Sequence, residues 1–167
     1  MFKKALIAAA GAALLCGAAN ADDFKVGVVS PARLLSESAP AVAAQDKLKN
    51  YFKKREEELN RDIRDFRTRA QKFEKDSPVM TETERLKQRN SLAETERDIA
   101  RRQRALVEER NQRASEESQL ILQRANRIIQ DIAKKQKFDL ILQDAIWASP
   151  RADITEQVMK ELNKPAK

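Results

Sequence analysis

Residues 40–76 read PAVAAQDKLKNYFKKREEELNRDIRDFRTRAQKFEKD, and this stretch decides the fold. After its first residue it holds neither proline nor glycine, the residues that break helices. It is dense in Lys, Arg, Glu, Gln and Ala, which lose little side-chain freedom in a helix. Apolar residues recur in it at strict seven-residue spacing, at Phe52, Leu59, Phe66 and Phe73. Such a repeat predicts a long helix that pairs with another helix.

A second run without helix breakers extends from residue 81 to residue 137. It carries two neighbouring apolar rows at the same period. One row consists of Leu92, Ile99, Leu106 and Leu120, and the other of Leu86, Ala93, Ala100, Val107, Ala114, Ile121 and Ile128. The stripe is broad but rich in alanine, and Arg110, Arg113 and Glu117 interrupt it. We therefore expect this second helix to be poorly buried.

The segment between the two runs marks a turn and a new helix start. Pro78 lies within residues 76–80 (DSPVM), and the following TETE at 81–84 has the pattern of a capping box, which begins a helix. We therefore predict a long antiparallel helical hairpin over residues 40–137, with its tip at residues 76–81.

The first 21 residues have the pattern of a cleaved signal peptide. Lys3 and Lys4 precede an apolar run over residues 5–15, and Ala-Asn-Ala at 19–21 offers a small-residue cleavage site. The apolar run is too short to span a bilayer. We therefore predict export to the periplasm and a mature chain that starts near Asp22.

Short strands are predicted at both ends of the hairpin. Residues 24–29 (FKVGVV) are rich in β-branched residues and end at Ser30-Pro31, which suits the start of a short helix. After the hairpin, residues 138–142 (FDLIL) and 146–148 (IWA) are two further strand candidates. Residues 153–156 (DITE) then have the pattern of a second capping box, before a terminal helix with Ile154, Val158 and Leu162 on one face.

These elements predict a mainly α protein with a small β body, in the α+β class. Residues 22–39 and 138–167 would form an association domain from which the hairpin projects. Three strands of this length bury too little to be stable alone and leave open edges, so we expect copies of the chain to associate. The predicted contact residues are Phe24, Val26, Val28, Leu140, Leu142, Ile146 and Trp147.

The composition excludes the common catalytic and cofactor chemistries. The sequence has no histidine, its one cysteine is Cys16 in the predicted signal peptide, and Gly27 is the only glycine beyond that peptide. Common catalytic triads, thiolate or imidazole metal sites and glycine-rich phosphate loops therefore have no residues to build them. Paired carboxylates such as Glu116-Glu117 lie on a helix face that we expect to be solvated. We predict no enzyme, no cofactor and no metal site.

The charge pattern points to acidic partners. The chain has 33 Lys and Arg against 26 Asp and Glu residues, a formal net charge of +7, and the excess lies in the hairpin. A basic helix is also typical of nucleic-acid binding. The predicted export argues against that class, so we expect no nucleic-acid partner.

The order of these pieces resembles the Skp (OmpH) family of periplasmic chaperones. The similarity rests on KVGVV at 25–29, on the charged hairpin, and on the block from FDLIL at 138–142 through DIT at 153–155 to Leu162. The resemblance implies a homotrimer in which the strands join into a central body. It also implies that the hairpins project as tentacles around a cavity that holds unfolded outer-membrane proteins without ATP.

The resemblance also suggests candidate contact residues on the hairpin. Members of the family are credited with lipopolysaccharide contact through basic tentacle residues, for which the candidates here are Arg101, Arg102 and Arg104. An alanine-rich seam suits a flexible arm that offers scattered apolar side chains to varied clients. We expect the phenylalanine row to hold the arms together and client contact to fall to Val79, Met80, Leu92, Ile99 and Leu106.

Two other functions remain open at this stage. A charged helical hairpin is also typical of structural adaptors in envelope complexes. A basic hairpin could equally serve a protein that binds lipopolysaccharide or an anionic membrane surface. Suppression of aggregation of an unfolded outer-membrane protein would separate the three, because only the chaperone requires it.

Overall fold

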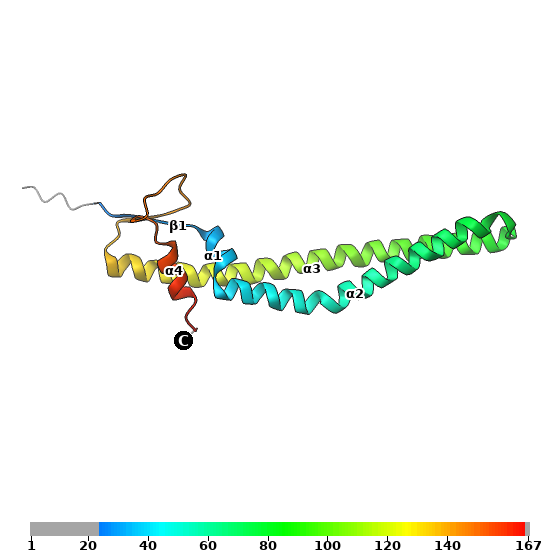
Figure 1. Cartoon of the computed structure of the whole chain (residues 1–167), viewed down its shortest axis with the longest axis horizontal. Helices are drawn as coiled ribbons and strands as arrows, with labels where there is room; N and C mark the ends of the chain where they lie inside the picture. The colour runs from blue at the N-terminus through cyan, green and yellow to red at the C-terminus, as the bar shows by residue number, and fades with distance from the viewer. Residues whose placement is uncertain (1–23, 166–167) are drawn as a thin grey trace, which may run out of the picture.

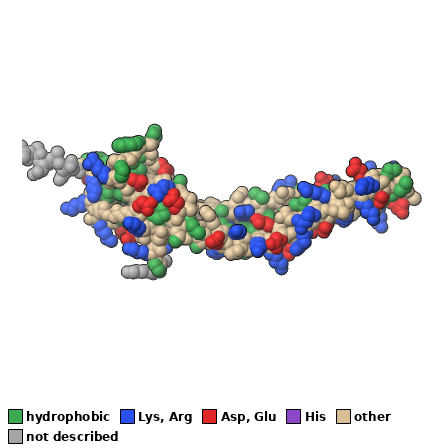
Figure 2. All heavy atoms as spheres, in the orientation of Figure 1, with side chains coloured by type: hydrophobic (Ala, Val, Ile, Leu, Met, Phe, Trp, Pro, Cys, Tyr) green, Lys and Arg blue, Asp and Glu red, His purple; other side chains and the backbone are tan. Residues whose placement is uncertain are grey.

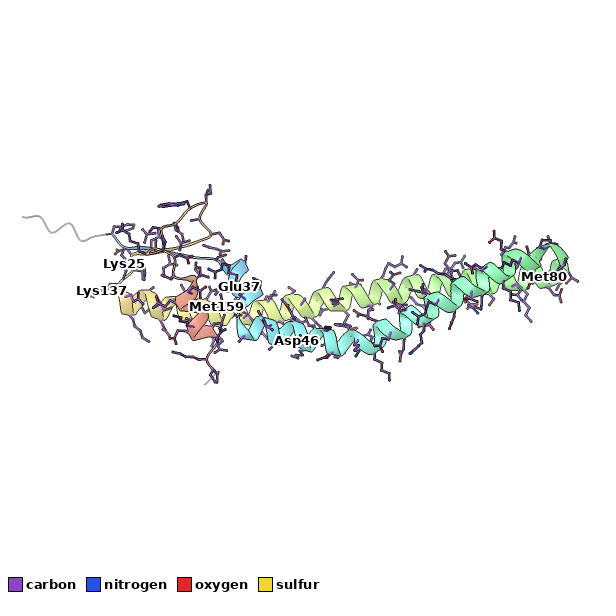
Figure 3. All side chains as sticks on the ribbon, viewed as in Figure 1. Lys25, Glu37, Asp46, Met80, Lys137 and Met159 are labelled. Carbon is purple, nitrogen blue, oxygen red and sulfur yellow. The ribbon has the colours of Figure 1, made fainter. Side chains whose placement is uncertain are left out.

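The computed structural model describes residues 24–165, and the predicted signal peptide lies outside this part of the chain. Two long helices form a hairpin that projects from a small base, where the two ends of the described chain meet (Figure 1). Lys25 and Lys137 lie at the base end and Met80 at the tip (Figure 3). The predicted α+β class with a long helical hairpin is confirmed.

The hairpin consists of α2 (Ala39–Asp76) and α3 (Glu82–Gln136), joined by the short 3-10 turn η1 (Ser77–Val79). Helix α3 begins where the sequence predicts. The Thr81 hydroxyl accepts a hydrogen bond from the Glu84 amide at 3.4 Å, and the Glu84 carboxylate accepts one from the Thr81 amide at 3.1 Å. This reciprocal pair is the predicted capping box, and it restarts the helix after the tip.

The two arms are unequal, and the difference creates the base. Helix α3 has 55 residues and α2 has 38, so α3 extends about 25 Å further at 1.5 Å per residue. Its last turns pack against α1 (Pro31–Glu37) and α4 (Thr155–Leu162). The core lies here and consists of Val29, Leu34, Ala41, Ile121, Ala125, Ile132, Ile154, Val158, Met159 and Leu162.

The β body is smaller than predicted. Strands β1 (Val26–Val29) and β2 (Leu140–Gln143) pair in parallel, with Val26 beside Leu140 and Val29 beside Gln143. The predicted third strand at 146–148 is wrong, because these residues form a loop between β2 and α4. Both edges of β1 are already occupied, one by β2 and the other by residues 152–154.

The backbone bonds on the second edge of β1 are well formed. The Val28 amide donates to the Ala152 carbonyl at 2.8 Å, and the Ile154 amide donates to the Val28 carbonyl at 2.9 Å. The residues that follow therefore enter α4 directly from the sheet edge. Residues 146–148 cannot pair with β1, because no edge of it remains.

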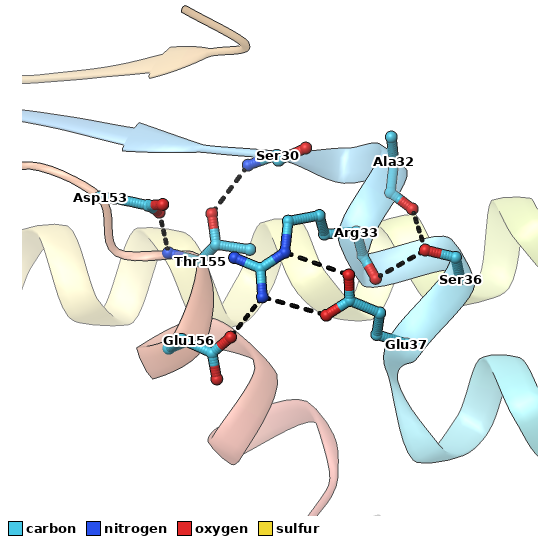
Figure 4. A network of polar contacts seen from close by, with 8 residues as sticks. All are labelled: Ser30, Ala32, Arg33, Ser36, Glu37, Asp153, Thr155 and Glu156. Carbon is cyan, nitrogen blue, oxygen red and sulfur yellow. Dashed lines mark hydrogen bonds and ion pairs between the residues drawn. The ribbon is translucent and has the colours of Figure 1, made fainter. Parts of the chain in front are cut away.

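Polar contacts join α1 to α4 at the base (Figure 4). The Ser30 amide donates to the Thr155 hydroxyl at 3.0 Å, and Arg33 bonds both Glu37 and Glu156. Asp153 accepts a hydrogen bond from the Thr155 amide at 2.8 Å. Hydrogen bonds from Thr155 hold the pKa of Asp153 below its usual value.

The second predicted capping box is therefore wrong. The terminal helix begins at Thr155 with Ile154 as its N-cap, which makes no side-chain cap, and Asp153 lies one residue earlier and accepts a hydrogen bond from the Thr155 amide. Glu156, the expected partner in the box, instead pairs with Arg33 of α1. A tertiary ion pair has replaced the local hydrogen bond, and it ties α4 to α1.

Candidate functional site

A group of exposed apolar side chains covers one side of the base. We call it the base patch, and it consists of Phe24, Leu140, Leu142, Ile146 and Trp147. The Ile146 side chain is fully exposed and Trp147 is 80% exposed, which is extreme for residues of this size. Hydrophobic atoms gather on this side of the base in Figure 2. Exposed apolar groups of this kind mark interaction surfaces.

The alternation of side chains along the strands explains the patch. In β1, Gly27 and Val29 are buried, whereas Val26 and Val28 are half-buried. Successive side chains of a strand point to opposite faces, and residues side by side in a sheet share a face. The register places Val26 beside Leu140 and Val28 beside Leu142. These four residues therefore share the sheet face that is turned away from the core.

Gly27 lies in the sheet where the first strand meets the end of the hairpin. A Cβ atom added at Gly27 would lie 3.1 Å from the Phe138 ring and 3.3 Å from Ile141. This close approach lets β1 lie against the chain that leaves α3. The seven predicted association residues are thereby gathered at the base, five of them exposed and two half-buried.

The tip and the arm differ in how they expose the predicted client residues. At the tip, Val79 is 88% exposed and Met80 is half-buried. On α3, Leu92 and Leu106 are half-buried, whereas Ile99 is only 8% exposed. This burial makes Ile99 a packing residue of the hairpin and removes it from the surface that a client could reach.

The predicted seam of α2 is packed unevenly. Phe52 and Leu59 are buried, but Phe66 and Phe73, further along the arm, are only half-buried. The burial of this row therefore decreases toward the tip. The distal arm presents its apolar side chains to solvent in part.

The three arginines predicted for lipopolysaccharide contact do not act as one group. Arg101 and Arg102 both pair with Asp98, and Arg102 also reaches Asp62 of the other arm at 2.8 Å. Arg104 instead lines a shallow groove on α3 beside Ala100 and Val107. The sequence alone did not identify Asp98 as the residue that holds two of these arginines.

Within the part of the chain that the structure describes, the acidic side chains form no group of three that could hold a metal ion. None of its helices is long and apolar enough to cross a membrane.

The family model described as outer membrane protein (OmpH-like) matches residues 25–162. This chain therefore belongs to the OmpH-like family. It is 34% identical over 163 residues to the chaperone protein Skp of Yersinia pseudotuberculosis, covering 96% of this chain and 99% of that protein. It is 27% identical over 162 residues to the chaperone protein Skp of Yersinia enterocolitica, with the same coverage.

A solved structure shares the architecture. The crystal structure of an OmpH-like outer membrane chaperone from Caulobacter crescentus superimposes with a TM-score of 0.69 at 20% identity, covering 83% of each chain. At this identity the match shows the fold alone. The hairpin on a small α+β base is thus an arrangement that this chain shares with an OmpH-like protein.

Proposed function

We propose that this chain is a periplasmic chaperone that holds unfolded outer-membrane proteins without ATP. The proposal rests on one observation about the arm. Half-exposed apolar side chains such as Phe66, Phe73 and Leu92 lie there among many exposed Lys and Arg side chains. Such an arm offers many weak contacts instead of one pocket, which suits varied unfolded clients. The relatives that are named chaperones support the same reading.

We further propose that the working form is a homotrimer that assembles through the base patch. The side chains of Phe24, Ile146 and Trp147 are largely exposed among the residues that the structure describes, and a second copy could bury them. The order of three comes from the resemblance to the Skp (OmpH) family. In this arrangement the arms surround a space, and their basic side chains would attract acidic clients.

Trp147 reports on this assembly because it is the only tryptophan. Its side chain is 80% exposed in one chain, so burial against another copy would lower its access to a quencher. Iodide should quench its fluorescence weakly in the assembled protein and strongly in a variant that stays monomeric. Quenching of the assembled protein as strong as that of free tryptophan would place Trp147 outside the interface.

The chaperone function is tested with an unfolded acidic outer-membrane protein diluted from denaturant. Light scattering should stay low in the presence of this protein and rise in its absence. Capture should slow markedly as salt rises from low to about half molar, because charge attraction acts over about 8 Å at physiological salt. The pair Val79→Ser and Met80→Ser should weaken binding only modestly.

Two results would refute this mechanism. If scattering rises equally with and without the protein, the protein does not prevent aggregation and the proposed chaperone function is wrong. If a single substitution on the arm eliminates binding, clients are held at a discrete recognition site and not by dispersed contacts. An unrelated basic protein of similar charge, added at the same concentration, controls for unspecific charge effects.

A second function is favoured by one surface of α3. Arg104 lies beside Val107, which is 54% exposed, so a cation and apolar surface occur together in the shallow groove. This combination suits the phosphates and acyl chains of lipopolysaccharide or an anionic lipid surface. Co-sedimentation with vesicles that contain anionic lipid, compared between the native protein and Arg104→Ala, tests this binding separately from client capture.

A further inference from the structure

The middle of the hairpin is held together differently from its base. We call residues 47–62 of α2 and 102–117 of α3 the polar section. Four ion pairs cross between the arms there, with N–O distances from 2.6 to 3.1 Å: Lys47–Glu117, Arg55–Glu109, Arg110–Glu56 and Arg102–Asp62. On α3, no residue between Ile99 and Ile121 is buried. In this section α2 contributes the buried apolar residues Phe52 and Leu59, α3 contributes none, and the ion pairs lie beside them.

Arg113 lies at the centre of this section, in an apolar row. Leu92, Ile99, Leu106 and Leu120 follow each other at multiples of seven, and Arg113 occupies the place between the last two. Such positions favour bulky apolar residues, and a polar residue there lowers stability. Arg113 is 43% exposed and Leu120 is 61% exposed, so this row turns away from the other arm here and gives the seam little apolar support.

The side chains around Arg113 form an interlocked cluster. Its guanidinium lies 4.4 Å from the centre of the Tyr51 ring and donates to the Tyr51 hydroxyl at 3.1 Å. Arg113 also donates to Glu109 at 3.1 Å, and Glu109 accepts from Arg55 of the other arm at 2.7 Å. Hydrogen bonds from Arg55 and Arg113 hold the pKa of Glu109 below its usual value.

Solvent reaches every charged group of the cluster. The side chains of Glu109, Arg113 and Arg55 are 30%, 43% and 45% exposed. Ion pairs with this exposure each contribute little to stability and weaken as salt is added. Apolar packing, which holds the base, is not screened in this way. The two kinds of contact must therefore respond differently to ionic strength.

We propose that the polar section is an electrostatic latch, which opens the middle of the hairpin when its ion pairs are screened while the base stays packed. Opening would uncover Leu59 and Leu106, which line a pocket of about 160 Å³ between the arms. Phe52, only 1% exposed in the closed arm, would gain exposure as well. The latch thus controls how much apolar surface the arm presents, and this consequence rests on the proposed chaperone function.

Hydrogen exchange of the full assembled protein, followed by mass spectrometry without any client, tests the latch. Between about 0.05 and 1 M NaCl, where the screening length falls from above 10 Å to about 3 Å, amides of residues 106–117 should exchange roughly tenfold faster. Amides of residues 121–132 should change less than about twofold, because apolar packing protects them.

Substitutions then assign the response to the cluster. Arg113→Leu adds an apolar side chain beside Tyr51 but leaves the four ion pairs between the arms in place, so exchange at 106–117 should slow at low and high salt while part of the salt response remains. Glu109→Gln removes the shared carboxylate, so exchange should be faster at low salt and respond less to added salt. Arg97→Leu, an exposed arginine of α3 without an ion pair among the described residues, is the matched control and should keep the native response.

The latch is wrong if exchange at residues 106–117 is insensitive to salt, or if Glu109→Gln retains the native salt response. It is equally wrong if residues 121–132 open to the same extent, because the response would then be global. None of these measurements involves a client. The latch can therefore fail while the chaperone function stands, and loss of chaperone activity would leave the latch intact.

Discussion

Replacing Ile146 and Trp147 together by glutamate should convert the assembled protein into monomers. Each side chain is almost wholly exposed in the single chain, so the substitution removes little packing within it. In an interface, each new carboxylate would be buried without a partner, which costs several kcal/mol per ion. Light scattering after gel filtration at micromolar concentration measures the mass, and circular dichroism should show that the helices persist.

Val107→Glu is the control for this experiment. Val107 is also an exposed apolar residue, but it lies on the arm, away from the base patch. This variant should keep the mass of the native assembly. Truncation after Lys137 removes β2 and the loop with Trp147, so it should also abolish assembly while leaving helical signal. If the double glutamate variant keeps the native mass, residues 146 and 147 lie outside the interface.

Leu162→Ala should strongly destabilise the base. The Leu162 side chain is wholly buried and belongs to the core that joins α4 to α3. Truncation of a buried leucine leaves a cavity and typically costs about 2–5 kcal/mol. Denaturant unfolding at fixed protein concentration measures the loss, because assembly couples stability to concentration.

Leu120→Ala is the matched substitution for this test. Leu120 has the same side chain and lies on α3, but it is 61% exposed. Surface substitutions usually change stability by less than about 0.5 kcal/mol. Equal losses for the two variants would mean that α4 does not pack on the base in solution as it does in this structure.

Local patterns predicted the hairpin because helix breakers, heptad spacing and capping residues all indicate the same helices there. Beyond Pro40 in the first turn of α2, helix breakers are confined to the tip. The heptad row of α2 begins at Phe52, and Thr81 and Glu84 form the capping box that their spacing indicates. The face of the terminal helix was also predictable. Ile154, Val158 and Leu162 are all buried against the base, as their spacing requires.

Contacts between distant parts of the chain could not be predicted in the same way. The two apolar rows of α3 are neighbours, and the sequence did not show that Ile99 would face the other arm. Residues 146–148 have the composition of a strand, but residues 152–154 take the free edge of β1. The pairing of Arg102 with Asp62 depends on the register of the arms, which no local pattern of charges determines.

The parallel pairing of β1 with β2 has a consequence for the order of folding. The Lys25 amide donates to the Asp139 carboxylate, 114 residues further along the chain. Contacts of such sequence separation form slowly, because the intervening chain must first be brought together. Helices α2 and α3 shorten that search, since their local contacts form first and fold the chain back on itself. The arms thus bring the two strands together before the sheet forms. During refolding, amides of α2 and α3 should become protected from hydrogen exchange before those of Val26 and Leu140.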